Sequence, residues 1–179
     1  VDGGFAQSGG GNVSLGADIT TVDNNISIGG ALTLLADTST ATAAIQTIEM
    51  STGAGAGNIQ LASISGTNAG LNNSLNLISG TGTTTVTGAI SGITLLGLQD
   101  TGATGAVSLQ GDVTVGGITT AAAAYNISLL GGTNDVTDAM TFLNTGDVTL
   151  GNANTDSLLF RGGLTAITQR RVNVHGKVQ

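Results

Sequence analysis

The chain has 179 residues, with 30 glycines, no proline, no cysteine and a formal net charge of −7. Charged residues make up 8% and hydrophobic residues 40%, which excludes disorder caused by high charge and low hydrophobicity. The missing cysteines exclude disulfides and thiolate metal sites. Four basic against 11 acidic residues argue against nucleic-acid binding, and no apolar run is long enough to span a membrane.

Short triplets of apolar, polar and apolar residues recur along the chain, each bounded by Gly, Asn, Asp or Thr. This period of two predicts short strands. In chain order the predicted strands are Val13–Leu15, Ile26–Ile28, Leu32–Leu34, Ile59–Leu61, Leu75–Leu77, Val107–Leu109, Ile127–Leu129, Val148–Leu150 and Val172–Val174. Between them, the irregular stretches Ala36–Met50, Asn68–Asn73 and Thr133–Asp138 are predicted to be corner loops.

The spacing of the triplets predicts a repeating coil. Successive triplets start at Val107, Ile127, Val148 and Val172, a step of roughly 20 residues. Three short strands joined by tight corners fill a coil of that size. We therefore predict an all-β fold, a right-handed parallel β-helix (a three-sided β-solenoid) of about nine coils of about 20 residues.

The composition suits such stacking. Inward positions form narrow apolar columns, and corners need residues that tolerate positive φ, such as Gly and Asn. A proline would remove a ladder hydrogen bond, and outward charges of one sign would repel each other from coil to coil. Ser, Thr and Asn in outward positions avoid that repulsion.

Several segments of the sequence resemble the repeats of large bacterial surface exoproteins of the filamentous-haemagglutinin and autotransporter type. These segments are Gly57–Leu61, Asn73–Ile90, Gly105–Leu109, Gly117–Thr120 and Gly146–Leu150. The resemblance covers about residues 9–179. It implies a right-handed parallel β-helix, secretion, a place at the cell surface, and elongated fibres used in adhesion or a biofilm matrix. It brings no catalytic residues to this chain.

We accordingly expect residues 1–179 to form a single solenoid domain, a segment or repeat unit of a longer extracellular fibre or adhesin, and not an enzyme. Its expected partners are further copies head to tail, adjoining repeats of the same chain, or surface glycans. The four basic residues all lie in the terminal coil 161–179, and all acidic residues precede it. One hypothesis makes this coil an assembly interface. The alternative is that the sequence is a segment cut from a longer repeat protein and that these charges only solvate one coil. The four are Arg161, Arg170, Arg171 and Lys177.

The densest polar cluster contains Asn134, Asp135 and Asp138, whose oxygens are ligands of the kind that Ca²⁺ takes. The glycine- and aspartate-rich nonapeptide of calcium β-rolls is absent, and a turn explains the cluster equally well. No other cofactor is indicated.

The sequence leaves a carbohydrate-binding or carbohydrate-cleaving β-helix and an ice-binding solenoid as alternative functions. Glu49 is the only glutamate, and no Asp-Asp pair provides the two carboxylates that glycoside hydrolysis needs. His175 has no neighbouring triad partner and stays unassigned. The threonines of Thr83–Thr87 and Thr119–Thr120 suggest outward ladders, but they do not recur at one phase. The aromatic residues are few and scattered for a sugar-stacking platform: Phe5, Tyr125, Phe142 and Phe160.

Asn12, Asn25 and Asn126 each begin an Asn-X-Ser pattern that fits N-glycosylation. A simpler interpretation is that each Asn ends a corner, the next residue points inward and the Ser points outward.

Overall fold

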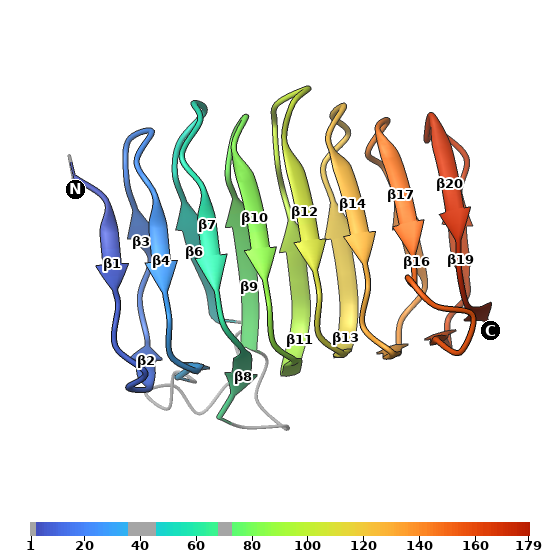
Figure 1. The fold of residues 1–179 in the computed structure, drawn as a ribbon, viewed down its shortest axis with the longest axis horizontal. Coiled ribbons are helices and arrows are strands. Elements are labelled where there is room, and N and C mark those ends of the chain that lie inside the picture. Colours follow the sequence, from blue (N-terminus) through green and yellow to red (C-terminus); the bar gives the residue numbers. More distant parts are fainter. Residues whose placement is uncertain (1–2, 36–45, 68–72) are drawn as a thin grey trace.

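The structure is a computed structural model that describes residues 3–35, 46–67 and 73–179. In these residues it contains strands, bends and turns and no helix. The strands wind into a parallel β-solenoid of about seven turns, with the N-terminus and the C-terminus at opposite ends of the stack (Figure 1). In that view the near strands run downward and the chain returns behind them as it advances from left to right, so the winding is right-handed.

The first face is one eight-stranded parallel sheet, in which each strand pairs with the next one along the stack. Its strands are β1 (Phe5–Gln7), β4 (Ile26–Ile28), β7 (Ile59–Leu61), β10 (Thr83–Val86), β12 (Ala106–Leu109), β14 (Asn126–Leu129), β17 (Asp147–Leu150) and β20 (Arg171–Val174).

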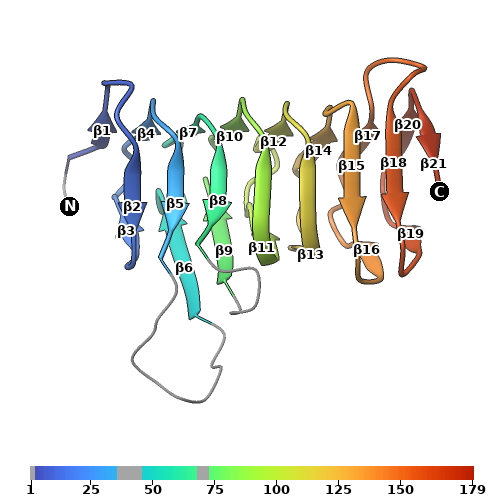
Figure 2. The ribbon, with the colours of Figure 1, turned by 90° about the horizontal axis from the view of Figure 1, so that it is seen from below.

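The second face follows after a tight corner and is also parallel throughout (Figure 2). Its strands are β2 (Val13–Leu15), β5 (Leu32–Leu34), β8 (Ile64–Gly66), β11 (Ile90–Leu98), β13 (Val113–Thr120), β15 (Thr133–Val136), β18 (Ser157–Phe160) and β21 (Lys177–Val178).

The third face completes each coil. The second halves of β11 and β13 belong to it, because both strands continue round the corner from the second face. In β11 the register shifts between Ser91 and Ile93, where Gly92 has a φ of 67°. The remaining strands of this face are β3 (Ile19–Thr20), β6 (Gln46–Ser51), β9 (Asn73–Ile78), β16 (Met140–Phe142) and β19 (Leu164–Ala166).

The prediction of a parallel solenoid is confirmed, with about seven turns of about 23 residues in place of nine shorter ones. The difference arises because the coils are unequal. The register step from Ile26 to its partner Ile59 is much longer than the step from Val107 to its partner Ile127. Seven spacings of about 4.8 Å give a stack roughly 34 Å long.

All nine predicted triplets lie in strands. The predicted corner loops are wrong in part. Thr133–Val136 forms β15 within the second face, and the predicted loop 36–50 ends in β6. Residues 36–45 and 68–72 lie outside the described residues, and Asn73 already begins β9.

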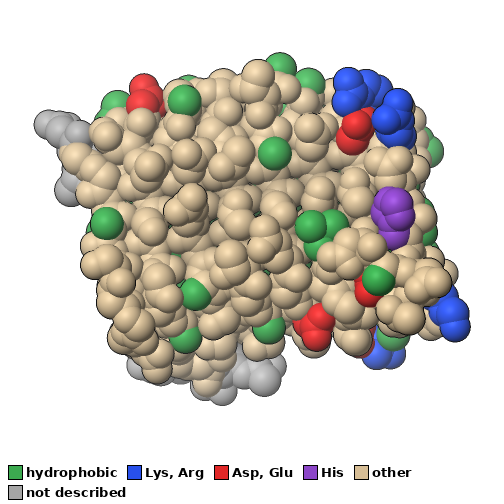
Figure 3. Space-filling model, in the orientation of Figure 1, with side chains coloured by type: hydrophobic (Ala, Val, Ile, Leu, Met, Phe, Trp, Pro, Cys, Tyr) green, Lys and Arg blue, Asp and Glu red, His purple; other side chains and the backbone are tan. Residues whose placement is uncertain are grey.

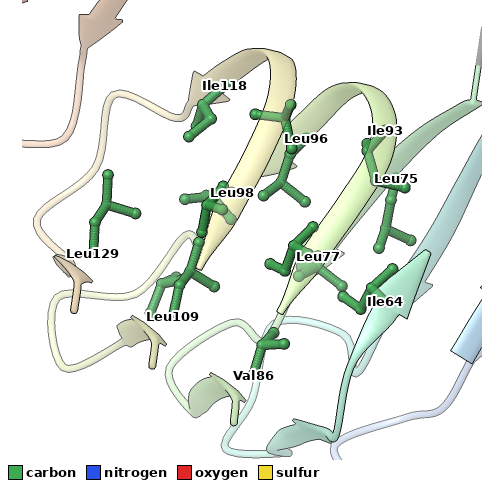
Figure 4. Close-up of a cluster of buried hydrophobic side chains, with 14 of the residues drawn as sticks. Ile64, Leu75, Leu77, Val86, Ile93, Leu96, Leu98, Leu109, Ile118 and Leu129 are labelled. Atoms are coloured by element: carbon green, nitrogen blue, oxygen red, sulfur yellow. The ribbon is translucent and has the colours of Figure 1, made fainter. Parts of the chain in front are cut away.

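The core is a set of apolar columns that run along the stack (Figure 4). Ile26, Ile59, Val107 and Val148 occupy rungs of one column, and each is at most 1% exposed. The single position of this column occupied by a polar residue is Thr84, which is also fully buried. Alternation along each short strand therefore divides the chain into an interior and a polar surface.

Candidate functional site

Asparagine side chains at the corner before the first face bond one coil to the next. The Asn25 Oδ1 accepts a hydrogen bond of 2.8 Å from the backbone N–H of Asn58. Asn58 Oδ1 in turn accepts one of 2.8 Å from the N–H of Thr83. Further along, the Asn126 Oδ1 accepts one of 2.8 Å from Asp147. These side chains satisfy backbone donors that a corner would otherwise leave without a protein partner.

Aspartates serve the same purpose at other corners. Asp112 Oδ1 accepts a hydrogen bond of 2.9 Å from the backbone N–H of Thr133, and Asp18 Oδ1 accepts one of 2.8 Å from that of Glu49. The Asp156 carboxylate accepts two from the backbone of its own corner, which lowers the pKa of Asp156. These carboxylates are engaged in holding the backbone.

Sequence reasoning missed Gln7, which clamps the first corner. Its Nε2 donates to the carbonyl of Gly11 at 3.1 Å, and its Oε1 accepts from the backbone N–H groups of Gly29 at 3.1 Å and Gly30 at 3.0 Å. The only sequence signal is a glutamine shortly before a run of glycines. Gly29 and Gly30 belong to the following coil, so this role depends on the register between coils.

A column of buried polar residues follows the third face. Each of its members lies shortly after the end of a third-face strand, and together they are Thr21, Thr52, Ser79, Asp100 and Asn144. Asp100 Oδ1 accepts two hydrogen bonds of 2.8 Å from Ser79, one from its backbone N–H and one from its hydroxyl. Asp100 Oδ2 is buried without a hydrogen-bond partner in the described part of the chain. Burial raises the pKa of Asp100, and the two bonds from Ser79 lower it by less.

We expect Asp100→Asn to stabilise the protein at pH 7, by about 1 kcal/mol, because it removes a buried charge and keeps an acceptor for Ser79. The folded-state pKa of Asp100 is raised, so its ionisation opposes folding above that pKa. This opposition disappears as the pH falls toward the ordinary aspartate value, about 3.9. Guanidinium titrations of both proteins between pH 4 and pH 7 measure the difference. If the extra stability of the Asp100→Asn variant did not shrink at low pH, this account would be contradicted.

Two of the four basic residues form ion pairs with the preceding coil. Arg161 Nη2 lies 2.6 Å from Asp135 Oδ2, and Arg170 Nη2 lies 2.7 Å from Asp147 Oδ2. In both pairs the arginine Nε also donates to the other carboxylate oxygen. Each guanidinium lowers the pKa of its carboxylate partner. Both pairs are exposed, so they contribute little to stability.

The four basic residues of the predicted assembly interface therefore differ in their contacts. Arg161 and Arg170 are engaged within the chain. Arg171 and Lys177 are exposed and lie in β20 and β21, the last strands of the first and second faces. The basic side chains gather at the C-terminal end of the molecule (Figure 3).

The residues of the predicted calcium cluster point in different directions. Asn134 is 1% exposed, and its side chain bonds the backbone of Val113 and Gly131. Asp135 is the next residue of the same strand, so it points outward and pairs with Arg161. Asp138 lies beyond the end of the strand and is exposed. Within residues 3–35, 46–67 and 73–179, no three His, Cys, Asp or Glu side chains gather closely enough to hold a metal ion.

The outer surface of the first face is a ladder of side chains that are polar on every rung after the first. The register places one central outward residue on each rung, and in order these are Ala6, Ser27, Gln60, Thr85, Ser108, Ser128, Thr149 and Asn173. Only some of them are threonines, so the ladder does not repeat one threonine motif on every coil. A shallow groove beside Ile28 and Leu61 is lined by Ser27, Gln60 and Thr85.

The aromatic side chains belong mainly to the core. Tyr125 and Phe142 are fully buried, Phe160 is 4% exposed, and Phe5 packs partly buried against the same core. The Tyr125 hydroxyl donates to the Leu98 carbonyl at 2.5 Å, and burial raises its pKa. These rings do not form a sugar-stacking platform.

The asparagines of the predicted glycosylation motifs lie as their corner interpretation requires. Asn25 directly precedes β4 and is exposed, whereas Ile26 is fully buried. Asn126 is exposed at the start of β14, and Asn12 is exposed just before β2. His175 is exposed after β20.

Most of the exposed large apolar side chains lie toward the C-terminal end of the described chain. Of the seven such residues among those described, Val172, Val174 and Val178 lie in β20 and β21, Ile167 lies on the corner before β20, and Leu143 lies on the corner after β16. On the first and second faces these valines continue columns whose earlier members, such as Val148, Leu150 and Leu158, are buried.

No protein-family model, curated protein or solved structure matches this chain. The described part of the chain also contains no helix with the length and hydropathy needed to cross a bilayer.

Proposed function

We propose that this chain is a structural module of an extracellular fibre or adhesin of the filamentous-haemagglutinin or autotransporter type, a stiff rod that presents polar ladders at a cell surface or in a matrix. The observation that carries this proposal is the uninterrupted parallel register of the first face, from β1 to β20. Every rung is tied to the next by backbone hydrogen bonds, and buried apolar columns fill the interior. Such a stack resists bending and pulling without any chemical step.

The polar side chains support a mechanical role. Asn25, Asn58 and Asn126 bond the backbone of the following coil, and Arg161 and Arg170 bond carboxylates of the preceding one. These contacts brace the corners, which are the points where a solenoid lacks sheet ladders. The hydroxyl and amide groups of the first face stay available to a ligand at the surface.

Stiffness is tested by placing two spin labels on the first face of the cysteine-free chain. Ser27→Cys and Thr149→Cys lie five rungs apart in the outward ladder. The two backbone positions are roughly 24 Å apart. We expect a narrow distribution of label-to-label distances, centred at this separation plus the length of the labels. The same pair in guanidinium is the control. A broad distribution of spin-label distances in buffer would overturn the proposal that the chain forms a stiff rod.

Adhesion is tested with beads that carry the chain, exposed to shear on glycan-coated and protein-coated surfaces. We expect retention that exceeds that of beads coated with the unfolded chain. No excess retention on any surface would contradict the adhesive role. Release of reducing sugar from polysaccharides would replace this proposal by carbohydrate cleavage, and thermal hysteresis would replace it by ice binding.

A further inference from the structure

The third face is interrupted inside the stack. From β3 to β13 each third-face strand is hydrogen-bonded to the next, and β16 is hydrogen-bonded to β19. Among the described residues no ladder joins β13 to β16, although the coils that carry these strands are neighbours (Figure 2). We call the contact between these two coils the β13–β16 junction. It has ladders on the first and second faces only, whereas the junctions on either side have one on all three faces.

The corner between the second and third faces changes length at this junction. In β13 two residues separate the inward Val115 from the inward Ile118, and β11 has a corner of the same length in register with it. In the next coil three residues, 137–139, separate Val136 from Met140, and the coil after it again has three, in register. Coils with equal corners therefore pair on the third face. Where the corner gains a residue, the donors and acceptors beyond it are offset and the ladder is lost.

A polar side chain lies where this ladder is missing. Thr120, at the end of β13, is in register with the fully buried Leu98 and is itself only 4% exposed. Its hydroxyl accepts a hydrogen bond of 2.8 Å from the backbone N–H of Leu143, just after β16. Phe142, the last residue of β16, is fully buried again. The apolar interior of the third face is thus interrupted at the same place as its ladder.

The ion pairs of the described chain do not reinforce this junction. The pairs made by Arg161 and Arg170 both join coils on its C-terminal side. Outside the two ladders the junction is crossed by hydrogen bonds at the corners, such as that of 2.8 Å from the N–H of Thr145 to the carbonyl of Ala123. In a stack whose coils contact only their neighbours, stability is approximately a sum over coils and junctions. The stack therefore opens most readily where a junction contributes least.

We propose that the stack opens at the β13–β16 junction, so that the coils from β14 to β21 unfold as one unit while the coils from β1 to β13 stay folded. The open state is a minor population of the native protein, of the kind that separates cooperative units within a fold. In a fibre under load the same junction yields first. This inference goes beyond the proposed function, because it concerns how the fold opens and holds for any role of the rod.

Native-state hydrogen exchange in low concentrations of guanidinium, resolved for each amide by NMR, measures this opening. We expect the amides of β14, β15, β17 and β18 to exchange through one shared opening, with protection at least about tenfold lower than that of β10, β11 and β12. Protection then falls in a single step at the junction. Fraying of the last coils would instead give a gradual fall from coil to coil. A gradual fall, or equal protection on both sides of the junction, would overturn the proposal.

Thr120→Val tests the junction itself, because it keeps the shape of the side chain and removes the acceptor for the N–H of Leu143. The protection of β14 to β18 should fall by a further factor of roughly five, and that of β10 to β12 should not change. Thr141→Val is the matched control, since it makes the same substitution at an exposed position of β16, in the ladder with β19. It should leave the protection on both sides unchanged. Equal losses on both sides for Thr120→Val, or equal effects of the two variants, would contradict the proposal.

The outcomes separate this proposal from that of the stiff rod. The spin labels at Ser27 and Thr149 lie on opposite sides of the β13–β16 junction, and their distance distribution stays narrow because the open state is a minor population. A narrow distribution together with equal protection on both sides would overturn the weak junction and leave the rod intact. A broad distribution would overturn the rod, whether or not protection falls in a step.

Discussion

Replacement of Gly82 by alanine is expected to lower the free energy of unfolding by about 2–3 kcal/mol. Gly82 is buried at the corner before β10, and a Cβ there would overlap the carbonyl oxygen of Gly57 on the preceding coil. The same Cβ would lie 3.0 Å from the carbonyl oxygen of Ser79. Both obstacles are backbone atoms, so relief requires two stacked corners to separate.

Guanidinium unfolding followed by far-ultraviolet circular dichroism measures this change, and the melting temperature should fall by roughly 5–10 °C. Gly10→Ala is the matched control, because nothing lies within 4 Å of a Cβ at that corner. It should stay within about 0.5 kcal/mol of the parent. Equal effects of the two substitutions would show that the corners are not packed against each other as the structure has them.

Replacement of Ile127 by alanine should destabilise the protein by about 3 kcal/mol. Ile127 is fully buried in β14 and is flanked by Val107 and Val148 in its column. Truncation leaves a cavity that the neighbouring rungs cannot close, because each is fixed by ladders on both sides. The adjacent Ser128→Ala, in the outward ladder, should change stability by less than about 0.5 kcal/mol.

This pair of substitutions tests the register as well as the packing. Because side chains alternate along a strand, a shift of one residue would exchange the interior and exterior positions of β14. Thermal and guanidinium unfolding of both variants provide the comparison. A larger loss for Ser128→Ala than for Ile127→Ala would refute the orientation of this strand.

The positions of the strands could be predicted from the sequence. Triplets such as Ile26–Ile28 and Val148–Leu150 carry a period of two and are bounded by corner residues, and both are local signals. The interpretation of Asn25 as a corner residue followed by an inward Ile26 also holds. The missing Pro and the scarce charge follow from stacking, because every inner strand needs both its ladders.

Among the strands that overlap the predicted corner loops, β15 is the one that lies wholly within such a loop. Asn134 occupies an inward position of this strand, so the alternation of apolar and polar residues breaks there and the segment resembles a turn. Asn134 can be buried there because its side chain is hydrogen-bonded on both sides. Its Oδ1 accepts from the backbone N–H of Val113, on the preceding coil, and its Nδ2 donates to the carbonyl of Gly131, at the corner before β15. A local pattern cannot contain that information.

The sequence by itself determined that this chain forms short parallel strands with apolar interiors and small corners, since period, turn residues and composition all act locally. Only the tertiary structure decided the number of turns, the pairing of Arg161 with Asp135, and the burial of Asp100 beside Ser79. Each of these depends on which residues meet between coils. Because the coils differ in length, as the unequal register steps from Val107 to Ile127 and from Ile26 to Ile59 show, the meeting residues follow from stacking and not from spacing.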